Sequence, residues 1–360
     1  MTEPINVKKR LSIIDIANSL NVSKTTISFI LNGRAQEKRI GAELVERVLK
    51  FVEEVGYKPN HLAKSLRTGK SHIIGLMVED IANPFFANIA RLIEDRAYTN
   101  GYKIIYCSTD NNTEKTKDLI EMYRDRHVDG YIMAPPEGIQ DEINSLIKAG
   151  FPVVLFDRKL DDVNADYVVV DNLFSTYNAT RHLISQGYKN IAYISFLSSQ
   201  FQLTQRMQGY KNALKEHNLK PIVKEVLFNR DNEIIMDPIR TFLNKRKDDI
   251  DAVLFGTNHI GVCGLRLFKE LGIKVPEDMA VVSFDDYEVF QLFTPPISAI
   301  AQPIVQIADN VITTLLSKLN SPFKDKSVKT IMLSTELNIR SSSVAANKKT
   351  MFSKQVIARM

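Results

Sequence analysis

The stretch that decides the N-terminal fold is residues 12–34, Ser-Ile-Ile-Asp-Ile-Ala-Asn-Ser-Leu-Asn-Val-Ser-Lys-Thr-Thr-Ile-Ser-Phe-Ile-Leu-Asn-Gly-Arg. Apolar residues recur at helical spacing, which predicts a first helix from Ile13 to Leu20 with Ser12 as its cap. Asn21 suits a tight turn, and Ser23 can cap a second helix that runs to about Leu31. Two short helices joined in this way are typical of a helix-turn-helix, whose second helix enters the DNA major groove.

The second helix is predicted to be amphipathic, with Ile27 and Ile30 on the face opposite its polar residues. Near its start, Lys24 can bind a guanine or a phosphate, and Thr25 and Ser28 can bind several bases. Phe29 can touch a thymine methyl. The alternative is a three-helix domain whose polar face contacts only solvent. The predicted DNA-binding residues of this head are Ser23, Lys24, Thr25, Thr26, Ser28, Phe29, Asn32 and Arg34.

The positive charge of the chain is concentrated beside this motif. The whole chain carries +5, yet residues 1–70 hold 13 Lys and Arg against 7 Asp and Glu, which gives +6. The remaining residues hold 34 basic and 35 acidic side chains, which gives −1. Neutralisation of phosphates by such a head predicts DNA binding that weakens strongly with salt.

Two further segments follow the motif before the chain changes character. A third helix, about Ala42 to Val55, is predicted to close a three-helix core. Pro59 then interrupts the helix, and Asn60 can cap a short new one. A helix of about eight residues is too short to be stable alone, so we expect it to form against DNA or a partner chain.

The remainder of the chain alternates short apolar runs with helical patterns, which predicts α/β architecture with parallel sheets covered on both faces. About 270 residues exceed one ordinary domain, so two lobes are expected. The predicted strands are 73–78, 103–107, 130–134, 153–156, 167–170, 191–195, 252–255, 280–284 and 331–337. The predicted domains are a DNA-binding head (1–58), a hinge (59–71), a two-lobed module (72–343) and a basic tail (344–360). Lobe 1 is about 72–171 and 301–330, and lobe 2 is about 172–300 and 331–343.

Polar and aromatic residues follow several of these strands. In open parallel sheets a ligand binds beyond the carboxyl ends of the strands, so two facing lobes would enclose it in a cleft. Carboxylates and arginines can hydrogen-bond sugar hydroxyls, while an aromatic face packs on the ring. Of the residues that follow these strands, the predicted effector contacts are Asp80, Phe85, Asp157, Arg158, Asn172, Asn258 and Asp285.

The chain resembles the LacI/GalR (lactose-repressor) family of bacterial transcription regulators over about residues 11–340. The resemblance rests on motifs spread through the head, the hinge and the start of the module. These are Asp15-Ile16-Ala17, Val22-Ser23 with Thr26-Ile27-Ser28, Leu31-Asn32-Gly33, Gly56-Tyr57-Lys58-Pro59-Asn60, Ala63-Lys64-Ser65-Leu66-Arg67-Thr68-Gly69 and Asn83-Pro84-Phe85-Phe86.

The resemblance implies a homodimer whose two hinge helices enter the minor groove of operator DNA. The position of Leu66 is then a wedge that kinks a base step, and Ala63 lies close to the groove and the partner helix. Asn60 and Lys64 complete the predicted hinge contacts. The resemblance also implies a periplasmic-binding-protein-like module with a small-molecule effector, and assigns effector contacts to Phe85, Asp157, Arg158, Arg206 and Asp285.

Three departures from the family pattern affect specificity. Position 29 is Phe where many members carry Arg, and the segment 35–40 is longer and more charged than the usual loop. Thr257-Asn258 replaces the Asn-Asp or Ser-Asp common at that site. The first two bear on the operator sequence, and the third bears on the effector. A sugar is favoured as effector, and a purine remains open because some members bind purines.

Other classes of protein find little support. No long apolar run or signal peptide is present, so a cytoplasmic protein without membrane contact is expected, associated with the nucleoid when bound to DNA. Two Cys and six His at wide spacing predict neither a disulfide framework nor a metal site, and no cofactor motif occurs. The tail lacks a leucine heptad, which argues against a C-terminal tetramerisation helix.

Three hypotheses therefore stand. The preferred one is a ligand-gated transcription regulator, commonly a repressor of carbohydrate-use genes, on a pseudo-palindromic operator. A solute-binding protein for transport would need neither the basic head nor its motif. A sugar-modifying enzyme would need a nucleophile or an acid–base pair, which the sequence does not reveal.

Overall fold

The structure is a computed structural model that describes residues 11–57, 69–320 and 327–345. The chain divides into two compact units, residues 1–71 and residues 72–360. The predicted hinge contacts Asn60, Ala63, Lys64 and Leu66 lie outside the described residues. Most of the basic tail does so as well.

The N-terminal unit has the three helices expected from the sequence: α1 (Ile13–Leu20), α2 (Lys24–Leu31) and α3 (Ala42–Glu54). A capping box starts α1, because the Ser12 hydroxyl accepts from the Asp15 amide at 3.3 Å and the Asp15 carboxylate accepts from the Ser12 amide at 2.7 Å. Asn21 ends the helix in the left-handed conformation, at φ 51°. The Ser23 hydroxyl then accepts from the Thr26 amide at 3.0 Å and starts α2. The predicted helix-turn-helix geometry is confirmed.

The three helices bury a small apolar core. Its fully buried members come one or two from each helix, and partly buried side chains surround them. The buried residues are Ile16, Ala17, Ile27, Ile30 and Val48. Because α2 has eight residues, this packing and not its own propensity holds it helical.

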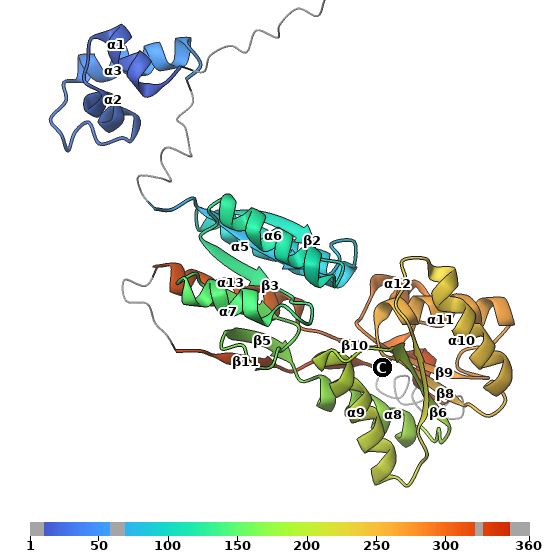
Figure 1. Ribbon diagram of the computed structural model, residues 1–360. Coiled ribbons are helices and arrows are strands. Elements are labelled where there is room, and N and C mark those ends of the chain that lie inside the picture. Colours follow the sequence, from blue (N-terminus) through green and yellow to red (C-terminus); the bar gives the residue numbers. More distant parts are fainter. Residues whose placement is uncertain (1–10, 58–68, 321–326, 346–360) are drawn as a thin grey trace, which may run out of the picture. The chain divides into compact units, whose positions relative to one another are not determined.

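The second unit contains two six-stranded sheets with the same strand order (Figure 1). The first sheet has the order β11-β5-β4-β3-β1-β2, and the second has the order β12-β10-β9-β8-β6-β7. All neighbouring strands are parallel except β12, which pairs antiparallel with β10. The strands are β1 (Ile73–Val78), β2 (Lys103–Ser108), β3 (Gly130–Met133), β4 (Val153–Phe156), β5 (Asp166–Val170), β6 (Ile191–Phe196), β7 (Ile222–Val226), β8 (Ala252–Phe255), β9 (Ala280–Phe284), β10 (Ser298–Ala301), β11 (Thr330–Leu333) and β12 (Glu336–Asn338).

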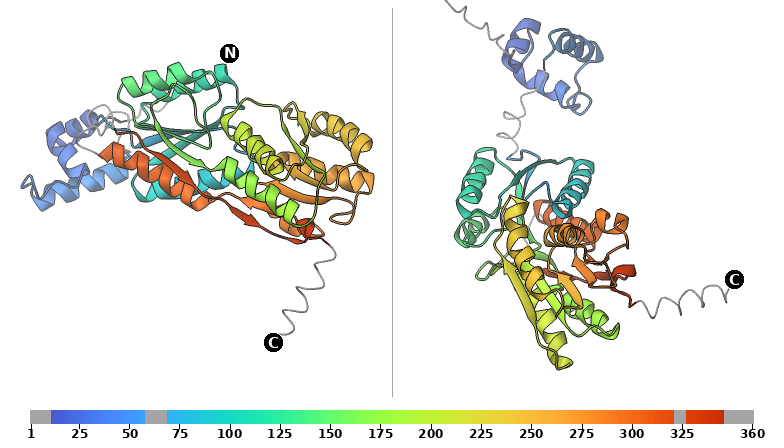
Figure 2. Two further views of the ribbon diagram at one scale, coloured as in Figure 1. Left: turned by 90° about the horizontal axis from the view of Figure 1, so that it is seen from below. Right: turned by 90° about the vertical axis from the view of Figure 1, so that its right-hand side faces the viewer.

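Helices cover both faces of each sheet, as the unbroken apolar runs of the inner strands predict. On the first sheet α5 and α13 pack on one face, and α6 and α7 on the other (Figures 1 and 2). On the second sheet α10 and α11 face α8 and α9 across the strands. These helices are α5 (Pro84–Thr99), α6 (Thr113–Asp125), α7 (Gln140–Lys148), α8 (Asn172–Ser185), α9 (Phe201–Glu216), α10 (Asn232–Arg246), α11 (Asn258–Leu271) and α13 (Ile304–Asn320). A short helix, α12 (Glu288–Leu292), follows β9.

The chain passes between the lobes three times: after β5, after β10 and between β11 and β12 (Figure 2). The prediction of one strand over 331–337 in lobe 2 is wrong. Residues 330–333 pair with β5 in lobe 1, and only residues 336–338 pair with β10 in lobe 2. Lobe 1 therefore extends about three residues beyond the predicted boundary at residue 330. The crossover explains the error, since one apolar run supplies an edge strand to each sheet.

Two strands and one helix start were not predicted. The edge strand β7 is too polar to show an apolar run, and β10 consists of Ser-Ala-Ile-Ala, whose small side chains are weak strand formers. The sequence pattern predicts a helix from Thr204 to Glu216, but α9 begins at Phe201, which places Arg206 more than one turn inside the helix. The side chain of Arg206 is thus held by a formed helix instead of a fraying end.

Candidate functional site

The polar face of α2 is accessible in the head. Lys24, Thr25 and Asn32 are exposed, whereas Ser28 and Phe29 are half-buried. The Asn32 amide nitrogen donates to the Ser28 carbonyl oxygen at 2.6 Å, which ties the end of the helix together. Ser23 and Thr26 are occupied with each other, since their hydroxyl oxygens lie 2.8 Å apart. The side chains free to meet a base edge are thus concentrated at Lys24, Thr25 and Phe29.

Phe29 has cations on its ring. The guanidinium of Arg34 lies 5.7 Å from the ring centroid and the ammonium of Lys38 lies 5.4 Å from it. Both cations also reach Glu37, Arg34 through two hydrogen bonds of 2.7 and 2.6 Å and Lys38 at 3.2 Å. These contacts lower the pKa of Glu37 to about 2, first through the hydrogen bond from Arg34. The sequence prediction of phosphate contacts overlooked this carboxylate, although the spacing of three residues between Arg34 and Glu37 is a known signal for a pair.

In the second unit, a cavity of about 260 Å3 lies between the lobes at the carboxyl ends of the strands. Its wall contains six of the eight predicted effector contacts, namely Phe85, Asp157, Arg158, Arg206, Asn258 and Asp285. Asn172 is buried behind the wall and contacts Arg206. Asp80 does not line the cavity, because its carboxylate turns back to accept from the Ala82 amide at 2.9 Å. The neighbouring Glu79 lines the cavity instead.

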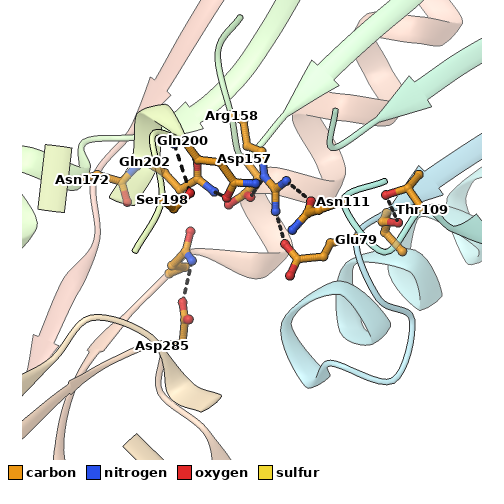
Figure 3. A network of polar contacts seen from close by, with 12 residues as sticks. Glu79, Thr109, Asn111, Asp157, Arg158, Asn172, Ser198, Gln200, Gln202 and Asp285 are labelled. Atoms are coloured by element: carbon orange, nitrogen blue, oxygen red, sulfur yellow. Dashed lines mark hydrogen bonds and ion pairs between the residues drawn. The ribbon is translucent and has the colours of Figure 1, made fainter. Parts of the chain in front are cut away.

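Arg158 forms the lobe 1 wall and is fully engaged by its own lobe (Figure 3). Its guanidinium donates to Asp157 at 3.1 Å and also to Asn111 and Glu79. Burial works against the charged guanidinium, but Glu79 and Asp157 outweigh it and raise the pKa of Arg158. For Asp157, burial is the largest effect and raises the pKa of its carboxyl, against the pull of Arg158 and Arg206. The result is a rigid, internally neutralised cluster.

Arg206 forms the opposite wall and is held by neutral groups of lobe 2. Its Nε donates to the Asn172 amide oxygen at 2.8 Å, and its Nη1 donates to the Gly256 carbonyl at 2.9 Å. The guanidinium lies 3.5 Å from the centroid of the Phe284 ring. Among the described residues no hydrogen bond uses Nη2. Arg206 therefore presents to the cavity a positioned guanidinium that its own lobe holds through neutral groups.

Two aspartates occupy equivalent places in the two lobes. Asp157 follows β4 at φ 67°, and Asp285 follows β9 at φ 65°. A left-handed backbone is uncommon outside glycine and costs of order 1–3 kcal/mol, a strain that clusters at functional sites. Asp285 accepts from the Gln302 side-chain amide at 2.6 Å. Both lobes thus use a strained turn at the same strand end to place a carboxylate in the cavity wall.

Aromatic rings make up much of the remaining wall. Phe85 and Phe86 come from lobe 1, with ring centroids 5.0 Å apart. Phe196, Phe228 and His259 form a cluster in lobe 2, with centroids 5.4 to 6.1 Å apart. Burial lowers the pKa of His259, which favours the neutral form of its imidazole. Its Nε2 lies 2.7 Å from the Asn232 side-chain oxygen, which leaves Nδ1 as an acceptor.

Several wall residues were missed by sequence reasoning: Glu79, Asn111, Gln202, His259 and Gln302. Gln202 is 4% exposed, and its Oε1 accepts no hydrogen bond from the described part of the chain. Glu79 was within reach, since it lies one residue from a predicted contact. The others come from loops and helix starts that carry no strand-end signal.

Several polar side-chain contacts between described residues join the lobes around the cavity. The Asn258 amide donates to the Asn83 side-chain oxygen at 3.3 Å. The Ser199 hydroxyl donates to Glu137 at 2.8 Å, and Arg230 pairs with Asp110 at 2.6 Å. The described lobes are therefore closed on each other by contacts that are individually weak.

Residues 12–60 match the model of bacterial regulatory proteins of the lacI family, and residues 180–343 match a periplasmic binding protein-like domain. The HTH-type transcriptional repressor PurR of Histophilus somni is 30% identical over 92% of this chain and 98% of its own. The chain belongs to the lacI family of bacterial regulatory proteins. It is a DNA-binding transcription regulator with an effector module, in agreement with the resemblance seen in the sequence.

This lacI-family chain is also similar to other bacterial regulators, including two solved structures. The regulator KdgR of Bacillus subtilis is 29% identical, over 92% of this chain and 97% of its own. A LacI family regulator from Enterococcus faecium, solved with bound ribose, is 27% identical with a TM-score of 0.67, and covers 76% of this chain and 98% of its own. The lac repressor dimer bound to operator shares the fold, with a TM-score of 0.80 at 22% identity over 94% of this chain and all of that one.

No described helix is long and apolar enough to cross a membrane. Within the described ranges, no group of three or more His, Cys, Asp or Glu is placed to hold a metal ion.

Proposed function

We propose that this lacI-family regulator is a repressor of carbohydrate-use genes whose DNA affinity is set by a sugar bound between the two lobes. It acts as a cytoplasmic homodimer on a pseudo-palindromic operator and binds its ligand without turning it over. The observation that carries the sugar assignment is a cavity wall that combines the Arg206 guanidinium with two strained aspartates, one from each lobe, and several aromatic rings.

The head reads the operator through α2. Lys24, Thr25 and Phe29 meet base edges, and Ser28, Asn32 and Arg34 support the helix or contact the backbone. Ser23 and Thr26 act mainly by fixing the start of α2. The hinge residues Asn60, Ala63, Lys64 and Leu66 bind the minor groove, with Leu66 as the wedge. These roles follow from the family resemblance.

A sugar matches the chemistry of the cavity. Vicinal hydroxyls can accept from Arg206 and donate to Asp285, while the C–H face of the ring packs on Phe85 or Phe228. The Gln202 oxygen and the His259 Nδ1 are two further acceptors for hydroxyl protons. Arg158 shapes the wall but has no spare charge, since Glu79 and Asp157 neutralise it. Asn172 acts behind the wall by fixing Arg206, and Asn258 acts beside it.

Control of DNA binding requires that the sugar bind the DNA-competent and incompetent states with different affinity. The cross-lobe contacts at Asn83, Glu137 and Asp110 are the groups that a change of lobe closure would make or break. A ligand that joins Arg206 of lobe 2 to the lobe 1 wall would favour the closed arrangement.

A thermal-shift panel of sugars, sugar phosphates and purines tests the proposal. A ligand that binds only the folded state raises the midpoint temperature of unfolding. At a free ligand concentration of 100 times Kd, it adds about 2.7 kcal/mol to the free energy of unfolding. A shift with neutral sugars is expected. A shift with purines alone would contradict the sugar assignment and leave the family assignment untouched.

A purine is the second candidate effector. Two observations favour it: the three-ring cluster of Phe196, Phe228 and His259, which can stack on a base, and the 30% identical purine repressor from Histophilus somni. In that case Arg206 would donate to a ring nitrogen or a carbonyl. The same panel decides between the two.

A further inference from the structure

A second cavity, of about 400 Å3, lies next to the first and is lined by both lobes. Lobe 1 contributes Glu137, Lys159 and Asp161, and lobe 2 contributes Phe201 and Thr204. Arg158 and Gln200 line both cavities, so these two side chains form the boundary between them. Figure 3 shows Gln200 and Gln202 of lobe 2 next to the Arg158 cluster of lobe 1.

The second cavity suits a neutral, hydroxyl-rich group. The carboxylates of Glu137 and Asp161 can accept hydrogen bonds from hydroxyl groups, and the ammonium of Lys159 can donate hydrogen bonds to them. Helix α9 starts at this cavity without a side-chain cap, so its first amide N–H groups are available as donors. Phe201 adds an apolar ring face. An anion is disfavoured, because Asp141 and Glu142 occupy the first turn of α7, which also begins there.

The sizes of the two cavities indicate how they would be used together. Small-molecule pockets are usually about 300–1,000 Å3, so the first cavity, at about 260 Å3, is below that range and fits one ring. With the second cavity the combined space falls well inside the range. The Ser199 hydroxyl donates to Glu137 at 2.8 Å, so a contact between the lobes lies in the wall of this second cavity.

We infer that the effector is a saccharide of at least two rings, with one ring against Arg206 and the next in the second cavity against Phe201 and Thr204. This inference rests on the proposed sugar effector. The boundary residues Arg158 and Gln200 then lie beside the glycosidic link. Because Arg158 is hydrogen-bonded to Glu79, Asp157 and Asn111, its side chain is held in one place and forms the wall next to the glycosidic bond.

Calorimetric titration of the full chain with matched sugars tests the inference. The probes are glucose with maltose, cellobiose and sucrose, galactose with lactose and melibiose, and xylose with xylobiose. At least one disaccharide should bind tenfold or more tightly than its component monosaccharide, a gain of about 1.4 kcal/mol.

A bulky substitution in the second cavity shows whether the higher affinity for the disaccharide arises there. Thr204 is exposed on α9 and lines only the second of the two cavities, so Thr204→Trp should weaken the disaccharide tenfold and leave the monosaccharide within twofold. The matched control is Gln208→Trp, on the exposed side of the same helix, which should change neither affinity. The chain has no natural Trp, so each variant carries a single tryptophan whose fluorescence also reports folding. Asp161→Ala, which deletes an acceptor instead of adding bulk, should selectively weaken the disaccharide as well.

The outcomes separate this inference from the proposal on which it rests. Monosaccharides that bind as tightly as disaccharides, or a Thr204→Trp variant that weakens both equally, would overturn the second site and leave the sugar effector intact. Binding of no saccharide in the panel would overturn both.

Discussion

Arg158 and Arg206 line opposite walls of one cavity, and their surroundings differ in kind. Lobe 1 surrounds Arg158 with the carboxylates Glu79 and Asp157, whereas lobe 2 holds Arg206 with a side-chain amide, a backbone carbonyl and an aromatic face. Both side chains are almost fully buried, at 3% and 4% exposed. The contrast predicts that Arg158, which its own lobe neutralises, is mainly structural and that Arg206, which its lobe does not neutralise, binds the ligand.

The largest expected effect is on stability, from Arg158→Ala. Removal of one partner from a buried ion pair leaves uncompensated carboxylates and typically costs about 3–5 kcal/mol. The free energy of unfolding, measured by denaturant titration, should fall by that order. Arg91→Ala is the matched control in the same lobe, because Arg91 is 70% exposed and its surface pairs should be worth less than about 1 kcal/mol. Equal effects of the two variants would show that the Arg158 cluster is not what stabilises lobe 1.

The second prediction concerns Arg206→Ala, which should weaken effector binding about a hundredfold, or roughly 3 kcal/mol. This variant should destabilise the fold less than Arg158→Ala does. It leaves only two neutral acceptors, on Asn172 and Gly256, without their donor, which should lower the free energy of unfolding by about 1–3 kcal/mol. Calorimetry with the best sugar measures the affinity. Arg206→Lys should recover little of it, because a lysine cannot keep both fixed donors. Full retention of sugar binding in Arg206→Ala would remove the contrast between the two lobes.

A third arginine, in the head, extends the comparison to the surface. Arg34 is paired with Glu37 as Arg158 is with Glu79, but the side chains of Arg34 and Glu37 are each about half exposed. Glu37→Gln should therefore leave stability nearly unchanged. It should release Arg34 and Lys38 for phosphates and steepen the salt dependence of binding to random-sequence duplex DNA by about one to two counterions. An unchanged slope would mean that neither cation reaches the backbone.

The smallest effect is a pH dependence from His259. Burial lowers the pKa of the imidazole in the folded chain, so the unfolded chain takes up the proton first as the pH falls. The stabilisation is complete above about pH 6.5 and is lost as the pH falls below that value. Urea midpoints measured from about pH 8 to about pH 5.5 should drop less in His259→Gln than in the natural chain. Parallel curves would place the pH dependence elsewhere.

Much of the fold was readable from the sequence because local signals agree with the tertiary structure. Ser12, Asn21 and Ser23 mark the ends of α1 and α2 by their own chemistry, and the apolar runs of the inner strands fix both sheets. The split between β11 and β12 was not readable, because one run serves two sheets.

The sequence predicted where most residues of the candidate site lie, but not which side chains they hydrogen-bond or pair with. Strand ends led to Asp157 and Asp285, and the family resemblance led to Arg206. Successive residues at a strand end point in different directions, so Asp80 was chosen where Glu79 lines the cavity. Arg158 is neutralised in part by Glu79 and also hydrogen-bonds Asn111, and these two residues lie 79 and 47 residues away in the chain. No spacing rule predicts such a contact. The difference between the two arginines therefore emerged only in three dimensions.

We propose that the ligand held by Arg206 controls the affinity of the helix-turn-helix head for DNA. The most direct test starts with a duplex selected from random DNA by the natural chain, and follows its binding by fluorescence anisotropy with and without the best sugar. The account predicts that the sugar changes the DNA affinity of the natural chain at least fivefold and that of Arg206→Ala not at all, while both bind the duplex equally without sugar. A sugar that binds the cavity and leaves the DNA affinity of the natural chain unchanged would contradict it.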